Sequence, residues 1–396
     1  MALNAGKKLI ISNIFYTIAT LFILGSSLQS FLLSVGFSEK QVANYLMFTQ
    51  IVQSIALFLG YFIIDRIKNI KAMYIASKAT IFILLAVMLF LNNGAFEFNA
   101  FPIFVICGMF VNLFIGFVNI MSYIFPVLVV KSDGYGKFVS LSSIIANVSI
   151  IAITFLISLS EGVISGQIVM NIAISVSMLA LLFSLIFIQV IKVDDQRDMS
   201  AKKGFSQFFK NFWNPLLFCD VLRGLAMGVV GSVMIFASKY GHLTVGQSTH
   251  YVTMSKVACL LGGAFVLVCV KKNMGNVIMA SCLIGAVLMP IILMLDNLIA
   301  IIALGLIFET TVIIEGQAVP IIISQTVKVD DLGKYTAKRM LILTGSTAIS
   351  SMIVGLVIDK AYSFAFVIVA AILHFAFGFG YFLVKNRGSK NREKEI

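Results

Sequence analysis

The chain has 396 residues, of which 60% are hydrophobic and 12% are charged, and its mean hydropathy is +1.03. These values exclude an ordinary soluble domain, in which roughly half of the residues are apolar and about a quarter are charged. The net charge of +12 is spread over short segments between apolar runs, so a basic nucleic-acid-binding domain is excluded as well.

The apolar runs number twelve, and each is close to the ~20 residues that a helix needs to span a bilayer. In chain order they cover 10–35, 40–64, 72–92, 100–130, 136–160, 166–191, 214–238, 246–270, 276–295, 298–326, 335–358 and 362–384. The sequence therefore predicts an all-α polytopic membrane protein with twelve transmembrane helices.

Basic residues lie mostly on one side of this predicted topology. Lys40, Lys239 and Lys360 fall in turns on the other side, and Lys256 lies within a span. Because Lys and Arg concentrate in cytoplasmic loops, we expect a multi-pass protein of the cell membrane with both termini in the cytoplasm.

All five cysteines lie within predicted spans and none has CxxC spacing. This pattern predicts neither disulfides nor a thiolate metal site, and the sequence indicates no cofactor.

Two pairs of segments indicate an internal repeat. "FSEKQVANYLMFTQ" (37–50) aligns with 243–256 at an offset of 206, and "SDGYGKFVS" (132–140) aligns with 329–337 at an offset of 197. We therefore expect two six-helix bundles related by pseudo-two-fold symmetry. The domain boundaries that follow are an N-terminal bundle over 1–192, an interfacial linker over 193–213, and a C-terminal bundle with a short basic tail over 214–396.

The stretch "GYFIIDRIKNIKA" from Gly60 resembles the motif that the major facilitator superfamily carries between its second and third spans. Asp65 and Arg66 match that motif, although Tyr61 and Lys68 replace its glycines. The resemblance extends over the twelve spans and implies transport by alternating access. It also implies a cytoplasmic gate of two ion pairs, Arg66 with Asp133 and, through the repeat, Lys272 with Asp330. The alternative is that these charges are ordinary solvated loop residues.

Ionisable residues within spans are costly, so each is a functional candidate by default. The sequence places all of them in the C-terminal half: Asp220, Arg223, Lys256, Glu309, Glu315 and His374. Asp220 and Arg223 are spaced i, i+3 and can meet on one helix face. They could neutralise each other, brace a neighbouring helix or contact solute.

Lys256 and Glu309 lie at similar depth in the eighth and tenth spans. They could form a proton-sensitive substrate site or a permanent ion pair between the two helices. Glu315 lies about 120° around the helix from Glu309, so the two carboxylates cannot share one centre. Gln50 and Asn119 could hydrogen-bond a solute or bridge helices.

These features favour a secondary active transporter that moves a small organic solute, with proton coupling left open, and that acts as a monomer. The alternatives are an exporter or flippase of amphiphiles on the same fold, or a membrane protein that transports nothing. A membrane enzyme is disfavoured because the chain has only three His, without H-E-x-x-H spacing.

Overall fold

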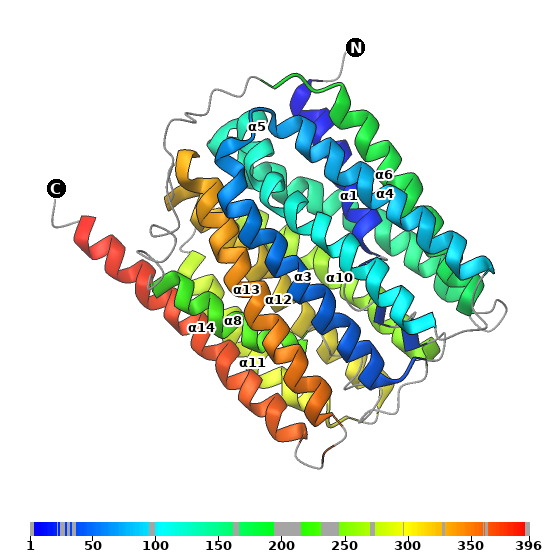
Figure 1. The fold of residues 1–396 in the computed structure, drawn as a ribbon. Helices are drawn as coiled ribbons and strands as arrows, with labels where there is room; N and C mark the ends of the chain where they lie inside the picture. Colours follow the sequence, from blue (N-terminus) through cyan, green and yellow to red (C-terminus); the bar gives the residue numbers. More distant parts are fainter. Residues whose placement is uncertain are drawn as a thin grey trace.

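The computed structural model describes residues 4–21, 37–94, 100–160, 166–193, 215–230, 245–269, 274–295, 297–326, 329–358 and 363–392, with a few single positions between them. Within these ranges the chain forms one bundle of helices (Figure 1). The helices are α1 (Ala5–Leu21), α3 (Glu39–Ile63), α4 (Ile70–Gly94), α5 (Ala100–Ser160), α6 (Gly166–Gln189), α8 (Pro215–Val230), α10 (Val245–Cys269), α11 (Met274–Ile292), α12 (Leu298–Thr326), α13 (Val329–Val357) and α14 (Ser363–Arg392), with a 3₁₀ turn η1 (Ile64–Arg66).

The helices have the length and composition of membrane spans. Among the described residues, eight segments are long and apolar enough to cross a bilayer, and 141–153 and 254–269 are shorter apolar segments. The sequence-based boundaries agree closely: the run expected at 298–326 is α12, and the run expected at 40–64 is α3. A multi-pass helical membrane protein is therefore confirmed.

The long helix α5 contains two crossings. Its 61 residues would measure roughly 90 Å if straight, about three times the hydrocarbon core of a bilayer. Its first part packs on α3, where Gly116 faces Ala56, and its second part packs on α10, where Ile144 faces Gly263. The sequence predicted a loop around Asp133, but the backbone is helical through it. With α5 counted as two crossings and each of the other described α-helices as one, the described helices supply twelve crossings.

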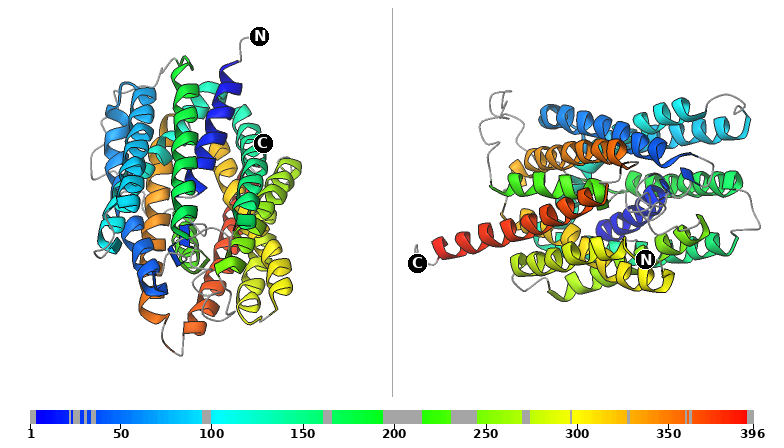
Figure 2. Two further views of the ribbon diagram at one scale, coloured as in Figure 1. Left: turned by 90° about the vertical axis from the view of Figure 1, so that its right-hand side faces the viewer. Right: turned by 90° about the horizontal axis from the view of Figure 1, so that it is seen from below.

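The two halves of the chain lie side by side. They pack against each other along a seam where the orange helix α13 stands next to the blue helix α3 (Figure 2). The seam between the halves is formed mainly by α3 with α13 and by α5 with α10. Residues 194–214, which hold most of the predicted linker, lie outside the described residues.

Close helix contacts depend on glycines at two positions of α8. A Cβ on Gly224 would lie 2.5 Å from the carbonyl oxygen of Leu343, and one on Gly228 would overlap Ser350. Both partners belong to α13, so these glycines let the α8 and α13 backbones approach closely. This contact positions α8, whose charged residues are described next.

Candidate functional site

Lys256 of α10 and Glu309 of α12 lie near each other, as their depths predicted. Ser255 Oγ donates a hydrogen bond of 3.3 Å to Glu309 Oε2, and both Lys256 and Glu309 act electrostatically on the Cys259 thiol. Both charged side chains are half-buried. Among the described side chains Lys256 forms no ion pair, so it is not locked to a carboxylate in this conformation.

Lys256 lies on the face of α10 that meets the N-terminal half. It precedes Gly263 by seven residues, which is two helical turns. A Cβ on Gly263 would lie 3.3 Å from Ile144 of α5 and 3.5 Å from Gln317 of α12. Lys256 is therefore at the seam between the two halves of the chain.

Hydrogen bonds cross the seam at two further places. Ser351 Oγ of α13 donates to Gln50 Oε1 of α3 at 3.0 Å, and Gln317 Nε2 of α12 donates to Ser143 Oγ of α5 at 3.1 Å. Gln50 thus bridges helices in this conformation. Asn119, the other predicted amide, is half-buried on α5, and its backbone carbonyl accepts a hydrogen bond from Ser122.

Asp220 pairs with a different residue from the one that its spacing suggested. Nε of Arg339, on α13, lies 3.2 Å from Oδ1 and 3.0 Å from Oδ2 of Asp220. Arg223 instead packs its guanidinium over the Phe377 ring of α14, 5.3 Å from the centroid. Asp220 thus braces a neighbouring helix and forms no direct ion pair with Arg223, because α8 lies between α13 and α14 and the two side chains enter different helix contacts.

Glu315 does not face the seam. It is 0% exposed, and its Oε1 lies 3.1 Å from Nε2 of His374 on α14. Cys282 of α11 completes a group whose ligand-type atoms all lie within 4.8 Å of one another. The contact between Glu315 and His374 is close but poorly aligned, because both carboxylate oxygens and both ring nitrogens lack a hydrogen-bond partner.

The prediction that buried ionisable residues belong to the C-terminal half is also wrong. Lys78 on α4 is 0% exposed; its Nζ donates to Ser184 Oγ at 2.9 Å and lies 4.3 Å and 4.2 Å from the ring centroids of Tyr16 and Tyr74. Lys78 lies near the cytoplasmic end of its predicted span, where basic residues are expected anyway. The feature of the sequence that could have indicated this contact is the i, i+4 spacing of Tyr74 and Lys78, which places both side chains on one face of the helix.

The internal repeat is visible in these contacts. Asn13 Nδ2 of α1 donates to Ser142 Oγ of α5 at 3.0 Å. Ser142 corresponds to Arg339 at the repeat offset of 197 residues. Asn13 corresponds closely to Asp220, which follows it by 207 residues, one more than the repeat offset of 206. The same pair of helices therefore carries a neutral hydrogen bond in one half and a buried ion pair in the other.

The predicted cytoplasmic gate falls largely outside the described residues. Lys272 is not described, and neither are the side chains of Asp65, Asp133 and Asp330. Arg66 ends η1 and is exposed. The two gate ion pairs therefore remain predictions.

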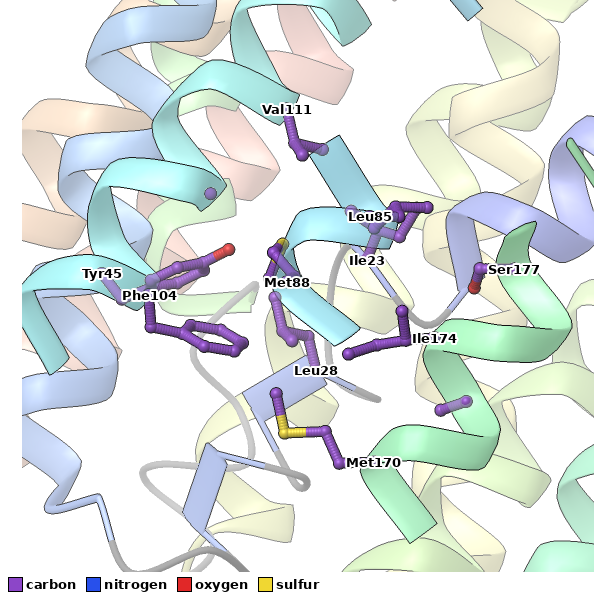
Figure 3. A pocket seen from close by; sticks show the side chains of 12 residues that line it. Ile23, Leu28, Tyr45, Leu85, Met88, Phe104, Val111, Met170, Ile174 and Ser177 are labelled. Carbon is purple, nitrogen blue, oxygen red and sulfur yellow. The ribbon is translucent and has the colours of Figure 1, made fainter. Parts of the chain in front are cut away.

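Two cavities lie among the described residues. One, in the N-terminal bundle, measures only about 20 Å³ and is lined by apolar side chains around Tyr45, Met88 and Ser177 (Figure 3). That is the space of one water molecule, so it holds no organic solute in this conformation. The other is an open apolar groove of about 310 Å³ between α3 and α13, lined by Met47, Ile51, Ser54, Ile55, Phe58, Leu341, Gly345, Ala348, Ile349 and Met352.

Comparison with known proteins gives a match in structure but not in sequence. No protein-family model matches the chain, and no curated protein matches it. The E. coli fucose:proton symporter FucP superposes with a TM-score of 0.67 at 15% identity, covering 95% of this chain and 97% of its own. An outward-facing bacterial homologue of the iron transporter ferroportin gives 0.72 at 11% identity over 96% and 98%. The human organic anion transporter MFSD10 gives 0.69 at 12% identity over 95% and 98%.

These alignments cover nearly the whole of each chain, so the fold is that of major facilitator superfamily transporters: twelve crossings in two six-helix bundles. The resemblance inferred from the Asp65–Arg66 motif is confirmed at the level of the fold.

Proposed function

We propose that this chain is a secondary active transporter that moves a small organic solute across the cell membrane by alternating access. The observation that carries the proposal is the pair of charged side chains, Lys256 and Glu309, on helices α10 and α12 of this fold. Lys256 faces the seam between the halves, and a rocking motion of one half against the other would expose that region to each side in turn.

The chemistry of the pair supports two roles. The Lys256 ammonium, which no described carboxylate engages, attracts an anionic group of the solute. Glu309 accepts a hydrogen bond from Ser255, the residue next to Lys256, so its protonation state changes the electric field around Lys256. Proton coupling through Glu309 is therefore part of the proposal. The other parts are a monomeric state, cytoplasmic termini, the bundle boundaries 1–192 and 214–396, and the absence of catalysis.

Flux through proteoliposomes tests this function. A thermal-shift screen of metabolites on the purified protein first identifies a ligand, and its uptake is then measured with and without a pH gradient. In Glu309→Gln we expect solute exchange without a gradient to persist and gradient-driven accumulation to be lost. Glu39→Gln, in the first turn of α3 and half-buried like Glu309, is the matched control. Accumulation with an unchanged pH dependence in Glu309→Gln would remove Glu309 as the proton carrier.

A second candidate function is movement of amphiphiles. The apolar groove of about 310 Å³ lies at the seam between α3 and α13, and the exposed side chains of Ile51, Ile55 and Ile349 line it. A molecule with an acyl chain could enter there from the bilayer. Transfer of a fluorescent phospholipid between leaflets of proteoliposomes distinguishes the two functions, because a transporter of a soluble metabolite leaves that rate unchanged.

A further inference from the structure

Cys282, Glu315 and His374 form an unusual group in the interior of the C-terminal bundle. They come from three helices, α11, α12 and α14, and all three side chains are buried. Glu315 and His374 are each 0% exposed, and although Glu315 Oε1 lies 3.1 Å from His374 Nε2, none of their four polar side-chain atoms forms a well-aligned hydrogen bond. Buried polar atoms are normally satisfied, so an unsatisfied set of this size calls for a physical reason.

We propose that these three residues bind a divalent transition-metal ion. A thiolate, an imidazole nitrogen and a carboxylate oxygen are the donors that Zn²⁺ and similar borderline ions take. The three donor atoms lie within 4.8 Å of one another. With metal–ligand bonds of ~2.0–2.3 Å, tetrahedral donors stand about 3.5 Å apart, so binding needs a contraction of about 1 Å by side-chain rotation.

A fourth oxygen, the Thr311 hydroxyl, also lies close to these donors at Gly285. A Cβ added to Gly285 of α11 would lie 2.9 Å from His374 Nε2 and 3.0 Å from Thr311 Oγ1. The Thr311 hydroxyl donates to the Phe308 carbonyl at 2.7 Å, which leaves its oxygen lone pairs available. The lack of a side chain at Gly285 thus lets an imidazole nitrogen and a hydroxyl oxygen lie close together against α11, where the Thr311 oxygen can serve as the fourth ligand.

Charge balance favours a dication with a deprotonated thiol. On binding, the Cys282 S–H bond breaks, the proton passes to solvent, and the thiolate and the Glu315 carboxylate supply two negative charges. Arg223 also lies near this group, since a Cβ on Gly316, the residue after Glu315, would lie 3.6 Å from its Nη2. Asp220, one turn before Arg223, is engaged by Arg339. The site is independent of the transport chemistry assigned to Lys256 and Glu309.

Cobalt titration of the purified full-length protein tests the site, because Co²⁺ replaces Zn²⁺ and reports its ligands by absorption. We expect the protein, once treated with chelator, to bind Co²⁺ with a thiolate-to-metal charge-transfer band. Cys282→Ser should abolish that band, and His374→Gln should weaken binding at least ~10-fold. Gly285→Ala, whose methyl group would press on His374 and Thr311 without removing a donor, should also weaken it. Binding should fall as the pH is lowered, since the ligands must lose protons.

Cys107→Ser is the matched control, because Cys107 is also a buried free cysteine but lies on α5 in the other half. The inference is overturned if the wild-type protein shows no cobalt-dependent charge-transfer band, or if Cys282→Ser binds Co²⁺ as the wild type does. If Cys282→Ser does not fold, unchanged binding in both His374→Gln and Gly285→Ala overturns it instead. A failure of solute transport leaves all these outcomes unaffected.

Discussion

At the scale of single residues, the C-terminal bundle holds its charged side chains in contacts between helices rather than along one helix. Asp220 and Arg339 are 119 residues apart in the chain and meet with almost no exposure to solvent. The desolvation of a buried ion pair offsets much of its attraction, so the intact pair adds little stability. Removing one partner is different, because the other charge then stays buried without compensation.

Asp220→Ala should therefore destabilise the protein by about 3–5 kcal/mol. The double variant Asp220→Leu with Arg339→Met should recover most of that loss, since it leaves no unpaired charge. A thiol-reactive dye measures the thermal midpoint, because all five cysteines are buried in the folded chain. Equal midpoints for Asp220→Ala and the wild type would show that Arg339 finds another partner.

At the scale of helices, packing depends on where small residues let two backbones approach. The contact of α8 with α13 runs over Gly224 and Gly228. By contrast, Gly345 of α13 faces an open part of the seam, where the nearest atom to an added Cβ would be Ser54 Oγ at 3.9 Å. The two kinds of glycine should respond oppositely to an added methyl group.

Gly228→Ala should lower the thermal midpoint, because its Cβ would overlap Ser350 and over-packing costs about 1–3 kcal/mol. Gly345→Ala is the matched control and should leave the midpoint unchanged or raise it slightly, since Ala is favoured over Gly inside helices by roughly 0.5–1 kcal/mol. The same dye assay measures both. A midpoint for Gly228→Ala at or above that of Gly345→Ala would contradict the close approach of α8 and α13.

At the scale of the whole molecule, alternating access requires the halves to separate at each end of the seam in turn. A Cβ on Gly355 of α13 would lie 3.5 Å from the Cβ of Ala43 of α3. These residues lie at the end of the seam opposite to Arg66, the end that the charge pattern places outside the cell. Their Cβ separation is within the range of a disulfide.

The double variant Ala43→Cys with Gly355→Cys should therefore cross-link on oxidation and stop solute flux, and a reductant should restore the flux. Mass spectrometry of the linked peptides confirms the bond, and each single variant controls for the substitution itself. Full flux through the cross-linked protein would mean that this end of the seam stays closed throughout transport.

The repeat links the residue scale to the molecular scale. Asn13 with Ser142 and Asp220 with Arg339 occupy corresponding helix pairs, but only the second pair is charged. Likewise the third and sixth helices of the N-terminal half carry Lys78 and Ser184, whereas those of the C-terminal half carry Cys282 and His374. Corresponding helices of the two bundles therefore carry different chemistry.

The sequence by itself determined the number, place and approximate ends of the spans, and the match of Asp65 and Arg66 indicated the fold. Hydropathy and short motifs are local properties, so a twenty-residue apolar run predicts a span whatever surrounds it. Even so, the helical turn through Asp133 was missed, because a break in hydropathy does not distinguish a loop from a helix that continues.

Only the tertiary structure decided which charged side chains meet. Arg223 packs on Phe377, Asp220 pairs with Arg339, and Glu315 contacts His374. The contact of Lys78 with the rings of Tyr16 and Tyr74 was not predicted either. The partner of a side chain depends on how each helix is rotated about its axis and which helices lie beside it. That rotation is set by packing over the whole bundle, where glycines such as Gly228 allow close approach, and no local pattern encodes it.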